Sequence, residues 1–149
     1  MIAMEYVCRV ASLDEIVSLR AAVIIRGTGR PNEFPEDRRD STLHFGAFLD
    51  AQNVGCASFM LNEWFGEPAY QLRGMAIAEL QRGHGIGRAL LRFSEAHIAV
   101  HTQVRQLWCN ARTSAITFYQ AADWSVASEE FDVGQVGPHR RMCKRLCKS

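Results

Sequence analysis

The stretch that decides the fold is Gln81-Arg-Gly-His-Gly-Ile-Gly-Arg-Ala-Leu-Leu91, just past the middle of the chain. It contains three glycines at alternate positions, Gly83, Gly85 and Gly87. Because glycine has no Cβ, the backbone N–H groups of such a loop can turn toward one point, and the helix that follows adds the positive end of its dipole. The stretch therefore predicts a phosphate-binding loop at a helix N-terminus, with Arg82 and Arg88 adding full positive charges.

Two common phosphate-binding motifs do not fit this loop. A dinucleotide fingerprint follows the first strand of its domain, and an acidic residue follows it about 20 residues later. Here the glycines come after half of the chain, and the next predicted strand ends in Asn110. A Walker loop ends in Gly-Lys-Ser or Gly-Lys-Thr, which does not occur here. From the glycines alone, a flexible loop without a ligand stays open as the alternative.

The segments before the loop carry alternating strand and helix signals. Ser12-Leu-Asp-Glu15 has the pattern of a capping box, so we expect a helix that begins there and reaches about Ile25. The other expected elements are a strand at Tyr6–Val10, a loop at 26–41, a β-hairpin of Leu43–Leu49 with Val54–Leu61, a second loop at Asn62–Pro68, and a strand at Tyr70–Ile77. Gly74 inside the last strand predicts a bulge.

The segments after the loop continue the alternation. We expect a helix from Ile86, a strand at Gln106–Asn110, a short helix from Thr113 to about Gln120, and two further strands between Trp124 and Met142. Asp123 follows the short helix and can adopt the left-handed conformation of a helix cap. This order of elements predicts a mixed α/β sheet with helices on both faces.

Length and composition limit the class of protein. The chain has 149 residues, of which 48% are hydrophobic, so we expect one domain over residues 1–149. A formal net charge of +1 predicts no binding to nucleic acid or to anionic membranes. No apolar run of about eighteen residues and no export signal is recognisable. Five cysteines without a C-x-x-C pair favour free thiols in a reducing cytoplasm.

Several motifs together resemble one family. Arg82-Gly-His-Gly-Ile-Gly87 followed by Arg-Ala-Leu-Leu91 resembles the pyrophosphate loop of the GNAT family of acyl-CoA N-acetyltransferases, and Asn110-Ala-Arg-Thr-Ser-Ala115 with Phe118-Tyr119 resembles its second motif. Leu72–Ala76, Trp108–Arg112 and Gly137-Pro-His139 are similar to a subgroup of small bacterial members. The resemblance implies a mostly antiparallel sheet of about seven strands, with its fourth and fifth strands splayed apart.

The resemblance also implies an activity. Acetyl-CoA would lie between the splayed strands, and an acetyl group would pass directly to a primary amine of a small molecule or peptide, without a metal. The residues expected to hold acetyl-CoA are Met75, Ala76, Ile77, Arg82, Gly83, His84, Gly85, Ile86, Gly87, Arg88 and Asn110. A homodimer is a further family-level expectation. An acyl-CoA-binding sensor or partner-binding module without transferase activity is the alternative function.

Direct transfer needs an acid for the leaving thiolate and a route for the proton of the amine. Tyr119 is the expected acid, since a phenol holds its proton at neutral pH; simple packing of Phe118 and Tyr119 is the alternative. His139 is the candidate base, because the resemblance places Gly137-Pro-His139 on the acceptor side. A structural histidine there, proton loss through water, or another base stays open; the other candidates are His44, Glu63 and Asp123.

Two further patterns bear on ligands. His97 and His101 have the i, i+4 spacing of helical metal ligands, but without an H-E-x-x-H motif we expect no metal site there. The segment from Arg26 to Asp40 is expected to cover the acceptor. Its carboxylates would suit a cationic amine: Glu33, Glu36 and Asp37.

Overall fold

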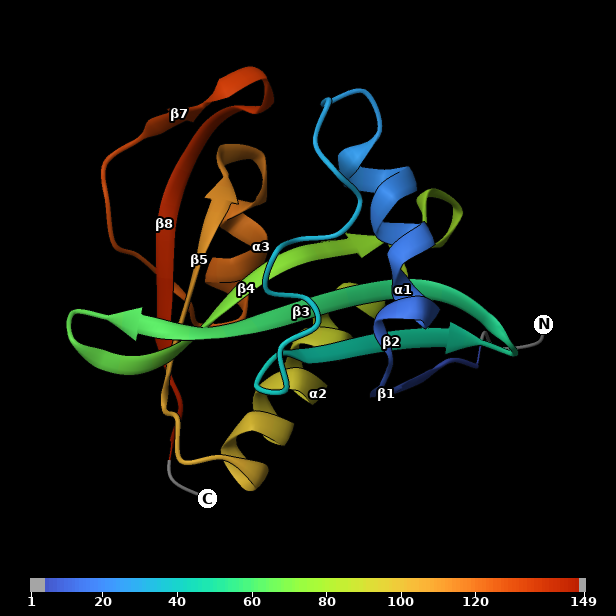
Figure 1. Cartoon of the computed structure of the whole chain (residues 1–149), viewed down its shortest axis with the longest axis horizontal. Coiled ribbons are helices and arrows are strands. Elements are labelled where there is room, and N and C mark those ends of the chain that lie inside the picture. The colour runs from blue at the N-terminus through green and yellow to red at the C-terminus, as the bar shows by residue number, and fades with distance from the viewer. Residues whose placement is uncertain (1–4, 148–149) are drawn as a thin grey trace.

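Strands and helices follow one another through almost the whole chain in the computed structural model (Figure 1). It describes residues 5–147, the side chain of Gln135 excepted, so residues 1–4 and 148–149 of the expected domain lie outside it. The elements are β1 (Val7–Val10), α1 (Leu13–Arg20), β2 (Leu43–Leu49), β3 (Gln52–Trp64), β4 (Glu67–Ile77), α2 (Ile86–His101), β5 (Gln106–Arg112), α3 (Ile116–Ala121), β6 (Ser125–Val126), β7 (Phe131–Val133) and β8 (Gly137–Arg145).

The strands form one sheet in the order β1-β2-β3-β4-β5-β8-β6, and β7 also pairs with β8. Only β4 and β5 are parallel neighbours within the described residues. This confirms the predicted mixed, mostly antiparallel sheet. It has eight strands where about seven were expected, because β6 and β7 are only two and three residues long and leave no alternating pattern in the sequence.

Helices cover both faces of the sheet, as predicted (Figure 1). Neighbouring residues of a strand point to opposite faces, and β3 shows this at two adjacent positions. Cys56 packs in one cluster with Leu13 and Ile16 of α1. Ala57 belongs to the main core with Leu90 of α2. In Figure 1, α1 accordingly lies in front of the strands and α2 behind them.

The first helix begins at the predicted capping box. The Ser12 hydroxyl accepts from the Glu15 N–H at 3.3 Å, and the Glu15 carboxylate accepts from the Ser12 N–H at 2.9 Å. Beyond Arg20 the chain stays helical to Ile25, as expected, but as the wider turns of a π-helix over Ala21–Ile25. Such segments often occur at functional sites. Here it forms part of a cavity wall described below.

The predicted loop at Asn62–Pro68 was wrong. The β3 and β4 strands continue through this region and are joined by a two-residue turn, Phe65-Gly66, with φ of 51° and 81°. Positive φ at both positions is typical of a type I′ hairpin turn. The polar residues that suggested a loop lie on a strand, where Asn62 accepts a hydrogen bond from Nε1 of Trp108 at 3.0 Å.

Two boundaries near the C-terminus also differ from the prediction. The strand β5 runs two residues past Asn110, to Arg112, and β8 runs past Met142, to Arg145. His139 lies in β8, opposite Arg112. Asp123 has φ of 69°, which confirms the left-handed cap after α3. Among the described residues, no helix is long and apolar enough to cross a membrane.

Candidate active site

The site begins where β4 and β5 part. Their parallel pairing runs from Ala69 opposite Gln106 to Leu72 opposite Cys109, after which β4 continues to Ile77 and β5 to Arg112 without pairing to each other. This confirms the predicted splay between the fourth and fifth strands. The edge of β4 that faces β5 therefore offers N–H and C=O groups that a ligand with amide groups can bind.

A bulge in β4 lies at this opening, as Gly74 predicted. Two residues of β4, Gly74 and Met75, lie opposite the single residue Ala57 of β3. Gly74 has φ of 66°, and a Cβ there would lie 2.8 Å from Nε of Arg20. Both its conformation and the close approach of Arg20 therefore require glycine at this position.

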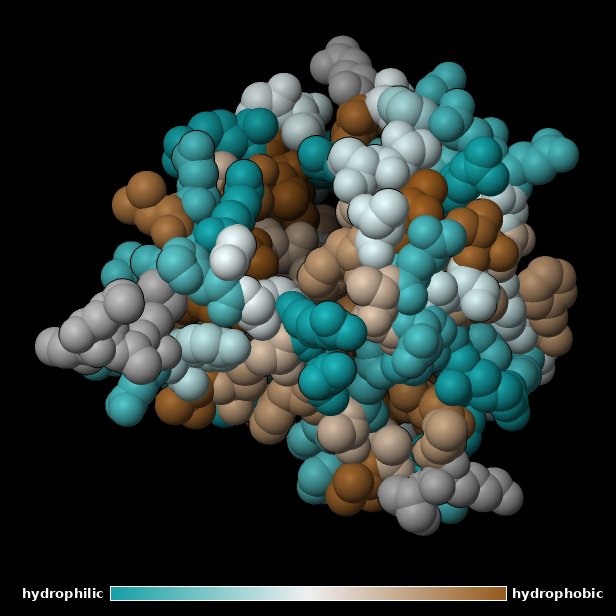
Figure 2. Space-filling view, turned by 180° about the vertical axis from the view of Figure 1, so that it is seen from behind, coloured by the Kyte–Doolittle hydropathy of each residue, from teal (hydrophilic) through white to brown (hydrophobic). Residues whose placement is uncertain are grey.

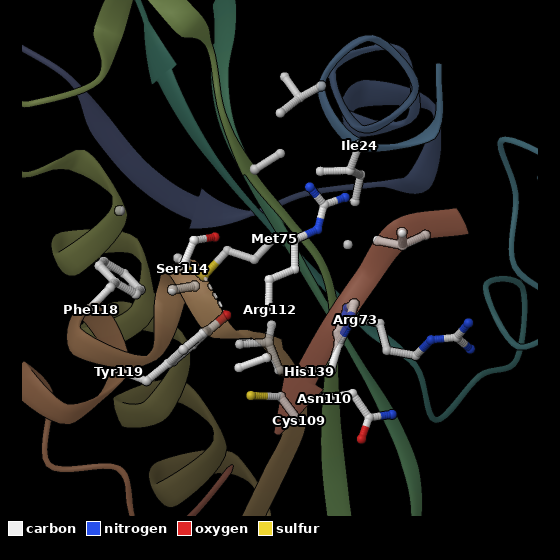
Figure 3. Close-up of a pocket in the computed structure, with 18 of the residues that line it drawn as sticks. Ile24, Arg73, Met75, Cys109, Asn110, Arg112, Ser114, Phe118, Tyr119 and His139 are labelled. Carbon is white, nitrogen blue, oxygen red and sulfur yellow. Dashed lines mark hydrogen bonds between the residues drawn. The ribbon is translucent and has the colours of Figure 1, made fainter. Parts of the chain in front are cut away.

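A cavity of about 770 Å³ occupies the opening. Its walls come from the bulged end of β4, the end of β5, α3, β8 and the π-helical segment (Figure 3). Seen from behind, the surface is hollowed at the height of this opening, with apolar residues at its margin (Figure 2). The residues expected to bind acetyl-CoA that line the cavity are Met75, Ala76, Ile77, Arg82, Gly87 and Asn110.

The glycine loop forms a second, adjoining cavity of about 320 Å³. Gly83 and Gly85 have φ of 82° and 80°, and a Cβ at either position would meet no atom within 4 Å. The first α-helical hydrogen bond of α2 runs from the N–H of Ala89 to the carbonyl of Gly85 at 3.1 Å. The N–H groups before Ala89 therefore have no partner inside the helix. This open loop, with unpaired donors at a helix N-terminus, fits a pyrophosphate.

The remaining loop residues differ in their placement. Gly83, Gly85, Ile86 and Arg88 line the second cavity, whereas His84 lines neither cavity. Arg82 lines both, and its Nε donates to the carbonyl of Ile77 at 3.3 Å. Arg88 donates to the carbonyl of Ala121 at the end of α3, at 3.0 Å. Arg82 is thus the arginine that connects the glycine loop with the strand opening.

Tyr119 reaches the cavity from α3. Its side chain is buried, and its hydroxyl donates to Sδ of Met75 in the bulge at 3.9 Å (Figure 3). Burial, together with the neighbouring Cys109 thiol, raises the pKa of Tyr119 far above its ordinary value of 10.0. The phenol therefore keeps its proton at neutral pH and holds it at the opening.

His139 reaches the same cavity from β8 and is also buried. Its Nδ1 lies 2.8 Å from the carbonyl oxygen of Gly137, and its ring stacks against Phe131 with ring centres 6.1 Å apart. Since a carbonyl oxygen can only accept, Nδ1 carries the proton, and Nε2 of the neutral ring keeps a free lone pair. Nε2 has no hydrogen-bond partner among the described residues.

The side chains at the end of β5 alternate between the two faces of the sheet. Cys109 and Ala111 are buried toward Tyr119, while Asn110 and Arg112 are exposed on the opposite face. All four line the cavity. Arg112 is a site residue that sequence reasoning did not single out. Its position opposite His139 depends on the pairing of β5 with β8, which no local pattern encodes.

The three carboxylates expected to suit a cationic amine are already paired with arginines, and none lines the cavity. Glu36 binds Arg73 at 2.7 Å, and Asp37 binds Arg20 at 2.6 Å. The remaining pair joins Glu33 to Arg38 at 3.0 Å. Glu36 and Asp37 therefore attach the segment from Arg26 to Asp40 to β4 and α1. No group of three histidine, cysteine or acidic residues within the described chain could hold a metal ion.

The ion pair between Arg20 and Asp37 is fully buried and fixes this segment to the sheet. Arg20 also donates to the Ser58 hydroxyl of β3 at 2.7 Å, and Ser58 lies 2.7 Å from Nδ1 of His44. The guanidinium stacks over the Phe34 ring, 4.2 Å from its centre, and Phe34 lines the cavity. This network therefore positions the part of the cavity wall that contains Phe34.

Several solved structures are similar in fold to the chain that forms this site. No curated protein sequence matches the chain. Among solved structures, Escherichia coli ElaA has a TM-score of 0.80 at 18% identity, over 96% of this chain and 100% of that one. FeeM, an N-acyl amino acid synthase from uncultured soil microbes, has a TM-score of 0.80 at 12% identity, over 95% and 90%. An aminoglycoside 6'-N-acetyltransferase complexed with coenzyme A has a TM-score of 0.72 at 10% identity, over 96% and 98%.

The similarity to these solved structures shows the fold of the chain. A family model shows, in addition, which family the chain belongs to. The model of the acetyltransferase (GNAT) family matches residues 15–124. The match spans most of the chain and includes the bulged strand, the glycine loop and Tyr119. The chain therefore belongs to the GNAT family of acetyltransferases.

Proposed function

We propose that this protein transfers an acetyl group from acetyl-CoA directly to a primary amine of a small molecule or peptide. The observation that carries the proposal is the convergence of Tyr119 and His139 on one opening, which is also lined by the free edge of β4 and by Arg82 of the glycine loop. A pure binding protein would need the loop and the strand edge, but not a buried phenol and an available imidazole nitrogen.

The chain's own groups suit the two ends of acetyl-CoA. The unpaired N–H groups of the glycine loop and the Arg82 guanidinium would bind the pyrophosphate. The free backbone of Met75 to Ile77 would pair with the pantetheine amides, and a backbone N–H near Ile77 would stabilise negative charge on the acyl oxygen. Bound in this way, acetyl-CoA supplies an activated acyl thioester. One solved structure with this fold was determined with coenzyme A bound.

Two side chains would carry out the proton transfers of the reaction. Nε2 of His139 takes a proton from the amine as the C–N bond forms, while Nδ1–H remains bound to Gly137. The Tyr119 hydroxyl gives its proton to the thiolate as the C–S bond breaks. The raised pKa of Tyr119 keeps it in the protonated form that this role requires.

Two measurements test the proposal. Acetyl-CoA should raise the melting temperature of the protein, whereas NAD should not. Release of free CoA should then be followed with a panel of primary amines. Transfer to at least one amine, reduced in Tyr119→Phe but not in Tyr70→Phe, supports the enzyme. Tyr70 is a suitable control because its hydroxyl binds the carbonyl of Ser41 at 3.1 Å and it does not line the cavity. Stabilisation by acetyl-CoA without any transfer would indicate a sensor instead.

A further inference from the structure

The arginines that line the large cavity make its charge positive. Among the described residues that line it, none is aspartate or glutamate. The cationic residues of the wall are Arg30, Arg73, Arg82 and Arg112. Cations gathered in a cleft with low-dielectric walls raise the local concentration of anions. The cavity therefore favours an anionic group in addition to the amine that the proposed reaction needs.

Two of these arginines are neither paired with a carboxylate nor part of the glycine loop. Arg73 is paired with Glu36 at 2.7 Å, and Arg82 belongs to the glycine loop. Arg30 and Arg112 have no carboxylate within 4.0 Å among residues 5–147. Arg30 donates to the carbonyl of Ile24 at 3.1 Å, which positions its guanidinium without cancelling its charge.

Arg112 lies on the acceptor side of the opening. It is the cross-strand partner of His139, so the two side chains leave the sheet on the same face. Figure 3 shows Arg112 extending from β5 across the cavity toward Ile24 of the π-helical segment. Arg30 follows that segment and lines the same cavity. An anion bound to Arg112 would therefore lie close to the proposed base and away from the glycine loop.

The acceptor side also has an apolar wall. Its residues come from the π-helical segment, the loop after it, β7 and the turn before β8: Val23, Ile24, Phe34, Val133 and Val136. Uncharged apolar surface next to two free cations suits a molecule with a carboxylate and a hydrocarbon side chain. It does not suit a polyamine or a lysine-rich peptide.

We propose that the acceptor is an apolar amino acid, with its carboxylate on Arg112 and Arg30 and its side chain against the apolar wall. This inference rests on the proposed transferase function and assigns its substrate class. An arginine can bind a carboxylate through two parallel hydrogen bonds, which would orient the neighbouring amine.

Matched acceptors test the role of the carboxylate. The probes are L-leucine, L-leucinamide, 3-methylbutylamine and the aminophosphonate analogue of leucine, each at saturating acetyl-CoA. We expect kcat/KM for leucine to exceed that for the amide and for the decarboxylated amine by about tenfold or more, the effect of losing a charge-assisted hydrogen bond. Equal or faster transfer to the two neutral analogues would overturn the proposal. A tenfold preference for the phosphonate would overturn the assignment to a carboxylate.

Arginine variants test the placement. Arg112→Gln and Arg30→Gln should each raise KM for leucine about tenfold and leave KM for acetyl-CoA and for 3-methylbutylamine unchanged. Arg39→Gln is the matched control, because Arg39 is exposed in the same segment and does not line the cavity. A rise in KM for acetyl-CoA, with KM for leucine unchanged, would show that these arginines serve the CoA phosphates and would overturn the proposal.

A binding experiment separates this inference from the proposed function. Calorimetry with the CoA-saturated protein compares N-acetyl-L-leucine with N-(3-methylbutyl)acetamide, and neither needs turnover. Tighter binding of the carboxylate, lost in Arg112→Gln, supports the inference even if no amine is acetylated and the transferase proposal fails. Equal binding of the two compounds, with transfer to neutral amines intact, overturns the inference and leaves the transferase function standing.

Discussion

The hydroxyl of Tyr119 donates to Sδ of Met75 at 3.9 Å, so the proposed acid faces the strand bulge at the cavity opening. In Tyr119→Phe we expect kcat to fall roughly 10²-fold, the usual contribution of a positioned acid. KM for acetyl-CoA should change little, because the ring and its packing remain. Since a thioether is a weak acceptor, the melting temperature should also stay within a few degrees. Steady-state kinetics beside Tyr70→Phe gives the comparison, and equal kcat in all three proteins would remove Tyr119 from the reaction.

The protonation of Tyr119 gives a second expectation. Its pKa is raised by burial beside Cys109, so the phenol stays protonated well above pH 10 in the folded protein. An acid with an ordinary phenol pKa would lose its proton near pH 10, and kcat would fall there. We expect no such fall between pH 9 and about 10.5, measured under conditions where circular dichroism shows the protein folded. A fall in kcat across that range would argue against the buried phenol as the acid.

His139 gives a test of the proposed base. With Nδ1–H bound to Gly137, only Nε2 can accept the proton of the amine. Glutamine has no basic ring nitrogen, so we expect His139→Gln to lower kcat roughly 10²-fold and to change KM for acetyl-CoA little. His101→Gln, at the exposed end of α2, is the matched control. Steady-state kinetics gives the comparison, and equal kcat in both variants and the unaltered protein would contradict the assignment.

Two variants of Gly85 should separate its effect on folding stability from its effect on acetyl-CoA binding. Its φ of 80° disfavours residues with a Cβ, so Gly85→Ala should cost about 1 kcal/mol in free energy of unfolding. Its Cβ would project into the open loop, where the pyrophosphate is proposed to bind, and should raise KM for acetyl-CoA. Asparagine tolerates this backbone conformation better. Gly85→Asn should therefore recover stability in urea titrations but not KM, whereas recovery of both would place the phosphates elsewhere.

The buried pair of Arg20 and Asp37 should matter for stability. Both side chains are fully buried, so Asp37→Ala leaves an unpaired charge inside the protein and should cost about 3 kcal/mol or more. The double variant Arg20→Met/Asp37→Leu removes both charges and should lose less. Urea unfolding of these variants and of Asp40→Ala, an exposed control, measures the difference. A loss in Asp37→Ala as small as that in Asp40→Ala would show that the pair contributes little.

Glu15 gives a pH-dependent test of the first helix. Its hydrogen bonds with Arg9 and Ser12 lower its pKa from the usual 4.5 to about 2. A carboxylate with a lowered folded-state pKa contributes stability above its unfolded pKa and loses it as the pH falls. The melting temperature of Glu15→Gln should therefore lie below that of the unaltered protein at pH 6 and converge with it toward pH 2. A constant difference across that range would contradict the role of the charge.

Local signals account for much of the fold. The glycine loop, the capping box of Ser12 and Glu15, the bulge at Gly74 and the cap at Asp123 were predictable, because each depends on a conformation that few residues adopt. The Phe65-Gly66 turn was missed, because the polar residues on its flanking strand ends resemble a loop. Two strands were expected between Trp124 and Met142, but three begin there, because β6 and β7 are two and three residues long and too short to show a repeated alternation.

The site was predictable only in part, for a different reason. Tyr119 and the residues of the glycine loop lie in short motifs. Arg112, in contrast, is recognisable as a site residue only from its pairing with His139 on β8, 27 positions away in the chain. The sequence also suggested that Glu36 and Asp37 would face the acceptor. Their neutralisation by Arg73 and Arg20 depends on contacts between distant segments, and these contacts reverse the charge expected of the cavity.

The buried ion pair of Arg20 and Asp37 has a consequence for sequence changes in the segment from Arg26 to Asp40. Arg20 fixes the segment at Asp37, while residues 26–31 carry Arg30 and two glycines with positive φ, Gly27 and Gly29, around which a Cβ would meet no atom within 4 Å. With the acceptor bound as proposed, an exchange of residues 26–31 alone would alter acceptor choice and leave the buried ion pair of Arg20 and Asp37 in place. An exchange that extends through Asp37 has to bring its own counter-charge for Arg20. The proposed acceptor site would then lie partly in a short segment whose sequence can change without loss of the buried ion pair.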